Sequence, residues 1–262
     1  MFAAQLDRAL GLGASLGREG WALLVLAPFV GSFLGVVIRR LPEGRPIVRG
    51  RSYCEGCGAR LTPRDLVPLV SLLLTHGRCR RCGHPLGWFY PGVELAAFAI
   101  AAIALAVDGV EQAWLDSLLG WWLLALGWID ARCWLLPDVL TLPLLVLGLV
   151  LAAVFAPEDL ANRAAAAALG YLALRIVAWV YQRLRHREGL GQGDAKLLAA
   201  AGAWLGIAAL PQVILVAALA ALAMAIGLAL ACTRLRAHSA LPFGPFLALA
   251  TWVLWLFGPL SP

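Results

Sequence analysis

Two aspartates, Asp130 and Asp194, lie at the ends of strongly apolar segments of this 262-residue chain. Asp130 ends the run Gly127-Trp-Ile-Asp130, and Asp194 follows two glycines in Gly191-Gln-Gly193-Asp194. A carboxylate beside or inside an apolar membrane segment is costly, so such residues usually serve a function. Two carboxylates that converge can share one proton and activate a water molecule for peptide hydrolysis. The glycines fit this interpretation, because glycine lets the backbone approach a substrate closely.

A structural interpretation of the same aspartates stays open at this point. Asp194 can be the N-cap of a helix after its glycine-rich turn, and Asp130 can be a charge at a helix end. Asp138, which follows Leu136-Pro137, can be the N-cap of the next helix. Spacing alone does not decide between these interpretations, since 64 residues separate Asp130 from Asp194.

Four of the six cysteines form two CxxC pairs with 21 residues between the pairs, namely Cys54, Cys57, Cys79 and Cys82. Two such pairs are typical of a tetrahedral zinc site, and four thiolates close its coordination shell, which indicates a structural role. A thiol redox motif would need only one pair. His76 and His84 flank the second pair and are alternative ligands.

The composition indicates which elements position these residues. Hydrophobic residues make up 62% of the chain and charged residues only 14%, which excludes an ordinary soluble enzyme. A membrane-spanning helix needs about 20 mainly apolar residues. We therefore predict an all-α polytopic membrane protein with about eight transmembrane helices, near residues 21–38, 91–108, 114–130, 139–156, 163–181, 195–208, 211–232 and 241–258.

The basic residues predict the orientation of these helices. The segment 39–88 holds ten arginines against three acidic residues, and the rest of the chain sums to −1 within a net charge of +6. Because basic loops stay in the cytoplasm, this segment and both aspartates are expected at the cytoplasmic face. The basic loop is interpreted as a topology signal that faces the lipid bilayer, and no nucleic-acid partner is expected.

Further motifs occur in a fixed order along the chain: Gly31-Ser-Phe33, Arg40-Leu-Pro42, the two CxxC pairs, Tyr90-Pro91 with Glu94, Asp130 with Pro137-Asp138, Gly191 to Lys196, and Pro242-Phe-Gly-Pro245. Together they resemble the bacterial type IV prepilin peptidases, which are leader peptidase/N-methyltransferases among the GxGD aspartic membrane proteases. The resemblance runs from about residue 28 to residue 250. One departure is Gly35, where the family usually carries asparagine.

The resemblance implies a function and a set of site residues. Asp130 and Asp194 match the catalytic aspartates, and active-site support is expected from Gly191, Gly193, Lys196, Pro137 and Asp138. The substrates would be prepilins or pseudopilins, cleaved after a glycine at the cytoplasmic face of the bacterial inner membrane. The new N-terminal residue would then be methylated with S-adenosylmethionine, whose binding residues the sequence does not identify, nor does it specify an oligomeric state.

These expectations divide the chain into four parts. Residues 1–20 are a non-cytoplasmic segment, 21–38 the first transmembrane helix, 39–88 a small cytoplasmic zinc loop domain with four cysteine ligands, associated with methyl transfer, and 89–258 a seven-helix peptidase domain. The alternative function is a polytopic transporter with a proton-coupled carboxylate pair. Transporters often carry inverted repeats and midplane charges, whereas these aspartates are expected at the membrane edge.

Overall fold

The computed structural model describes residues 17–47, 53, 56–60, 62, 67–68, 75, 77–85, 87–185, 191–231 and 241–259. In these residues the secondary structure is helical, apart from two isolated β-bridges. The chain forms two compact units, Met1–Trp121 and Trp122–Pro262, which are described separately below.

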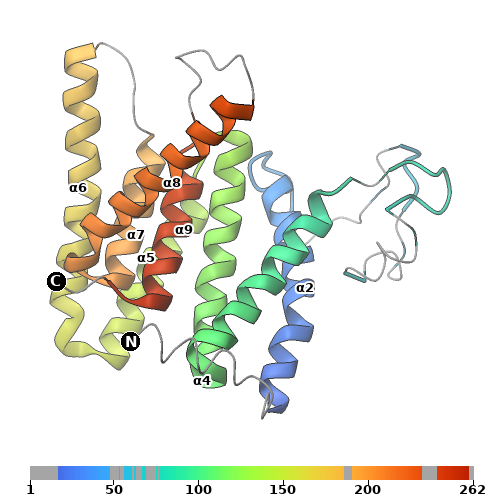
Figure 1. Ribbon diagram of the computed structural model, residues 1–262, viewed down its shortest axis with the longest axis horizontal. Coiled ribbons are helices and arrows are strands. Elements are labelled where there is room, and N and C mark those ends of the chain that lie inside the picture. The colour runs from blue at the N-terminus through green and yellow to red at the C-terminus, as the bar shows by residue number, and fades with distance from the viewer. Residues whose placement is uncertain are drawn as a thin grey trace. The chain divides into compact units, whose positions relative to one another are not determined.

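The helices follow the apolar segments of the sequence. They are α2 (Arg18–Arg40), α4 (Phe89–Cys133), α5 (Asp138–Phe155), η2 (Pro157–Asp159), α6 (Leu160–Arg185), α7 (Gln192–Leu205), η3 (Ile207–Ala209), α8 (Leu210–Ala231) and α9 (Gly244–Phe257), as Figure 1 shows. Within the described residues, five helical stretches are long and apolar enough to cross a membrane, namely α2, α4, α5, η2 with α6, and η3 with α8. The all-α, multi-pass fold class is therefore confirmed, while the count of eight crossings stays a prediction.

The long helix α4 is two helical limbs joined at one residue. Gly109 interrupts it with φ 75° and ψ −175°, a left-handed conformation that glycine adopts without steric cost. The indole N–H of Trp121 donates to the carbonyl of Ala97 at 2.9 Å, and each of these residues lies twelve positions from Gly109. The limbs therefore fold back on each other, so the segments expected at 91–108 and 114–130 are separated by a single glycine.

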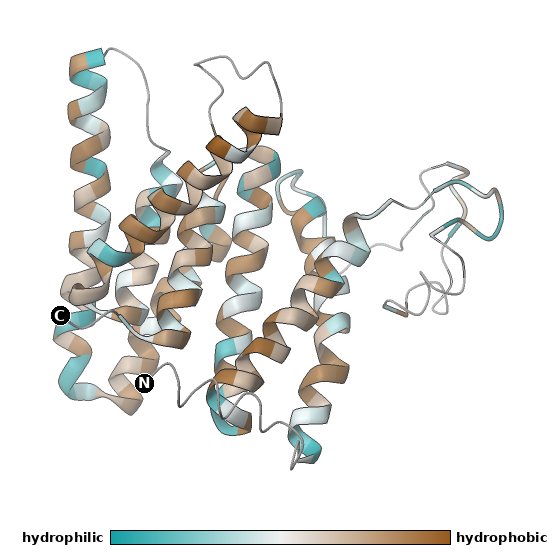
Figure 2. Ribbon diagram, in the orientation of Figure 1, coloured by the Kyte–Doolittle hydropathy of each residue, from teal (hydrophilic) through white to brown (hydrophobic). Residues whose placement is uncertain are grey.

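The outer faces of the helices are strongly apolar. Val25, Val139, Phe155 and Leu184 are among many large hydrophobic side chains that are exposed, and Figure 2 shows hydrophobic residues along the whole length of the helices. Soluble monomers rarely expose apolar surface on this scale. These surfaces fit contact with lipid, in agreement with the membrane class deduced from composition.

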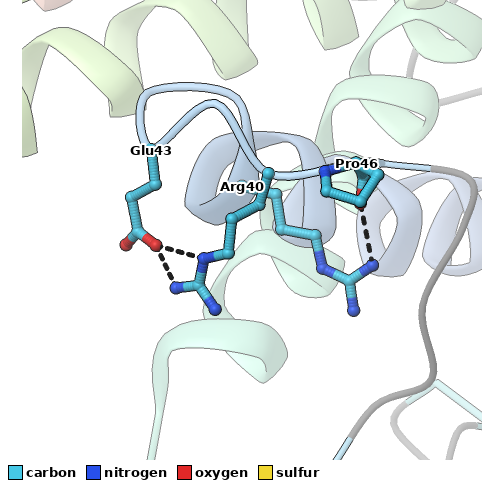
Figure 3. Close-up of polar contacts among 4 residues, drawn as sticks. Arg40, Glu43 and Pro46 are labelled. Atoms are coloured by element: carbon cyan, nitrogen blue, oxygen red, sulfur yellow. Dashed lines mark hydrogen bonds and ion pairs between the residues drawn. The ribbon is translucent and has the colours of Figure 1, made fainter.

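A compact turn follows the basic end of α2. The guanidinium of Arg40 donates to the carbonyl of Pro46 at 3.2 Å and to that of Ile47 at 3.5 Å, and Arg45 pairs with the carboxylate of Glu43. Figure 3 shows the Arg40 side chain reaching across to Pro46. The turn thus ties the start of the basic loop to the last turn of α2.

In the second unit, α7 packs against α5, α6 and α9. Close approach depends on small residues, because a Cβ at Gly202 would lie 2.6 Å from the Ala166 carbonyl group, as is common between membrane helices. At the far end of α7, Arg163 of α6 donates to the carbonyl of Trp204 at 2.5 Å. The Trp204 indole in turn donates to the Leu144 carbonyl at 2.9 Å. The C-terminal end of α7 is therefore fixed to α5 and α6.

Candidate active site

The two aspartates come from different helices and line one cavity. Asp130 lies in the last turns of α4 and Asp194 in the first turn of α7, with only 6% and 8% of their surfaces exposed. The cavity has a volume of about 490 Å³ and is lined by Asp130, Trp134, Leu135, Leu136, Pro137, Asp138, Gly191, Gln192, Gly193, Asp194 and Lys196. All seven residues that the sequence singled out for peptidase chemistry are thus placed around it.

Asp130 is held by the first residue of α9. The backbone N–H of Gly244 donates to Asp130 Oδ2 at 3.0 Å, and this contact is buried. A Cβ at Gly244 would lie only 2.6 Å from the same oxygen, so no other residue fits here without displacing the carboxylate. Gly244 was not among the predicted site residues, although its motif, Pro242-Phe-Gly-Pro245, was noticed.

Asp194 is the third residue of α7, and Gly191 is the N-cap of that helix. The interpretation of Asp194 as the N-cap is therefore wrong. Likewise Pro137 is the N-cap of α5, and Asp138 is the first residue of that helix.

Gly193 brings the loop between α4 and α5 onto the start of α7. A Cβ at Gly193 would lie 2.6 Å from Leu136 Cβ, and Leu136 is itself buried. The second glycine of the GxGD motif therefore permits close packing, which fixes the loop that follows Asp130 against the helix that carries Asp194.

An ion pair lies beside the aspartates. Lys196 Nζ lies 2.5 Å from Asp138 Oδ1, joining α7 to α5 at the cavity wall. Its partners are 26% and 56% exposed, so solvent screening limits its contribution to stability to about 1 kcal/mol or less. The pair joins the first turns of α7 and α5 beside the aspartates.

In the first unit, three of the four predicted zinc ligands are brought together. The ligand atoms of Cys57, Cys79 and Cys82 all lie within 4.8 Å of one another, and Cys54 lies outside the described residues. Two antiparallel bridges, Tyr53 with Arg60 and Arg78 with Pro85, enclose the two CxxC pairs at equivalent positions. Two matching knuckles that present thiolates to one point suit a tetrahedral Zn²⁺ ion.

Comparison with known proteins identifies the family. The bacterial peptidase A24 N-terminal domain matches residues 25–107, and the type IV leader peptidase family matches residues 117–226. The chain belongs to the type IV leader peptidase family. The boundary between the two matches falls at the Gly109 turn of α4.

Curated relatives match nearly the whole chain. A prepilin leader peptidase/N-methyltransferase of Burkholderia pseudomallei is 41% identical over 261 residues, which cover 90% of this chain and 84% of that protein. Proteins of the same name from Aeromonas hydrophila and Pseudomonas aeruginosa are 40% and 38% identical, covering 87% and 90% of this chain and 87% and 89% of their own lengths. No solved structure matches the chain.

Proposed function

We propose that this protein is a membrane-embedded aspartic endopeptidase and N-methyltransferase. It removes the leader peptide of type IV prepilins or pseudopilins after a glycine and methylates the new N-terminal residue with S-adenosylmethionine. The observation that carries the peptidase assignment is the shared cavity of Asp130 and Asp194 in a chain of the type IV leader peptidase family. Family membership gives no support to the alternative, a proton-coupled transporter.

The geometry suggests a division of roles between the aspartates. In this mechanism Asp194 carries the proton that the pair shares. The Gly244 N–H donates a hydrogen bond to Asp130 Oδ2. The other oxygen, Oδ1, is then the one that accepts a proton from the attacking water. The water oxygen bonds to the scissile carbonyl carbon, Asp194 protonates the leaving amine, and the C–N bond breaks. The titration belongs to the pair as a whole.

Substitution of either aspartate tests the peptidase assignment. Asp130→Asn and Asp194→Asn should each abolish cleavage of a purified prepilin by reconstituted enzyme. Both variants should still transfer label from S-adenosylmethionine to a pilin that has already been cleaved. Asp159→Asn, in the 3₁₀ turn η2, is the matched control and should cleave normally. Cleavage by either of the first two variants would overturn the assignment.

We further infer that Cys54, Cys57, Cys79 and Cys82 hold a structural zinc ion. The grouping of the three described thiols supports this, and the ion would hold the two knuckles of the basic loop together. Metal analysis of the purified protein should give one zinc per chain, and Cys79→Ser should lower that content. Absence of zinc from the folded, active protein would refute the inference.

The membrane arrangement is part of the same proposal. We place eight helical segments across the bacterial inner membrane, with the ten arginines of residues 39–88 and the cavity at the cytoplasmic face. Labelling of single introduced cysteines from either side of the membrane tests this arrangement. Labelling of an Asp138→Cys variant from the periplasmic side alone would contradict it.

A further inference from the structure

The connection between α4 and α5 forms one wall of the cavity. Its residues Trp134, Leu135 and Leu136 all line the cavity, directly after the helix that carries Asp130. The N–H of Trp134 donates to the carbonyl of Asp130 at 2.9 Å and closes that helix. The connection then ends in the extended conformation of Pro137, with φ −71° and ψ 134°.

Trp134 ends the helix in a left-handed backbone conformation that is unusual for a residue with a large side chain. Its φ is 55°, and no other non-glycine residue in the described part of the chain has a positive φ. A residue with a Cβ is disfavoured in this left-handed region, which glycine or asparagine usually occupies at a helix end. The indole is nevertheless 57% exposed, so packing in the fold does not account for it. Strain of this kind beside a reactive cavity points to a functional use.

Two backbone N–H groups of the same segment make no backbone hydrogen bond in the part of the chain that the structure describes. Among the described residues, the N–H groups of Leu135 and Leu136 donate to no backbone carbonyl. The side chain of Leu136 is buried against Gly193, which fixes the segment relative to Asp194. Unpaired main-chain N–H groups outside regular secondary structure can donate to the carbonyl groups of another chain, as in strand addition.

We propose that Trp134–Leu136 binds the substrate in extended form alongside the two aspartates, with the exposed indole of Trp134 contacting an apolar substrate side chain next to the scissile bond. The proposal rests on the proposed function, because it takes the cavity to be the peptidase site. It fits a peptide substrate because the cavity lining combines apolar residues, Trp134, Leu135 and Pro137, with the charged groups of Asp130, Asp194 and Lys196.

Binding of an intact prepilin to the Asp130→Asn enzyme in nanodiscs tests the indole contact. Trp134→Gly and Trp134→Asn both suit the left-handed backbone, so both should fold with unchanged or higher melting temperature. Loss of an indole that the substrate buries should weaken prepilin binding about 10- to 100-fold, and Trp134→Phe should recover most of it. Trp179→Ala removes an exposed tryptophan of α6 and should bind normally.

The backbone contact has its own test. Synthetic prepilin peptides with one N-methyl group at successive positions near the scissile bond should lose cleavage at alternate positions, because alternate N–H groups of an extended chain face the same way. Wild-type affinity of both Trp134→Gly and Trp134→Asn would overturn the proposal and leave Trp134 as a membrane-interface residue. Cleavage by Asp130→Asn would instead overturn the proposed function.

Discussion

Replacing Gly244 by alanine should inactivate the peptidase while leaving the protein folded. The new Cβ would lie 2.6 Å from Asp130 Oδ2 and 2.9 Å from Asp130 Cγ, where ordinary contact begins at 3.4 Å. The carboxylate must therefore move by nearly 1 Å, or α9 must shift and lose the 3.0 Å hydrogen bond from its first N–H. A misplacement of about 1 Å costs roughly 100-fold in rate, or about 2.7 kcal/mol in transition-state stabilisation.

Single-turnover cleavage of prepilin, measured beside methylation of a pilin that is already cleaved, checks this prediction. Gly244→Ala should lose about 100-fold in the cleavage rate and keep methyl transfer. Gly127→Ala is a matched control at the same contact between α4 and α9, because its Cβ would lie 3.3 Å from Pro245 Cα without touching Asp130. Cleavage by Gly244→Ala at a rate close to that of the wild type would refute the reasoning. Equal loss of both activities would indicate a folding defect instead.

Two further predictions concern the packing of the loop and the metal. Gly193→Ala should lower cleavage because its Cβ would lie 2.6 Å from Leu136 Cβ, and adding Leu136→Ala should restore part of it in the same assay. If the proposed zinc ion is bound, its removal by a chelator should expose the thiols of Cys57 and Cys82 to alkylation. Thiols equally reactive before and after chelation would argue against a zinc site.

Local sequence patterns predicted the helices well but not their exact limits. The apolar run expected at 195–208 corresponds to α7, yet the helix begins at Gln192 and includes Asp194, because a glycine-rich turn can continue as a first helical turn. The segments expected at 91–108 and 114–130 are joined by Gly109 alone, although the expected boundaries leave five residues between them. A single residue with positive φ leaves no compositional signal.

Contacts between distant segments explain what the sequence did not reveal about the site. The placement of Asp130 beside Asp194 could be expected from topology, since both ends were assigned to one membrane face. Gly244 could not be assigned a role, because it lies 114 residues from Asp130 and acts through its backbone N–H and the absence of a side chain. Trp134 was also missed, since the conformation that distinguishes it is visible only in the backbone geometry.

The short length of α7 has a consequence for the access of water to the aspartates. Its 14 residues extend about 21 Å, which is less than the roughly 30 Å of a hydrocarbon core. Arg163 holds the C-terminal end of α7 level with the start of the 26-residue α6, and Figure 1 shows α6 extending well beyond the start of α7. The length that α7 lacks for a full crossing is therefore missing at its N-terminal end, which carries Asp194. Nearly all of α7 is buried, so neighbouring helices and not lipid surround it. In the proposed membrane arrangement, α7 stops short of the cytoplasmic surface of the bilayer, which leaves water rather than lipid to fill the space between that surface and the aspartates.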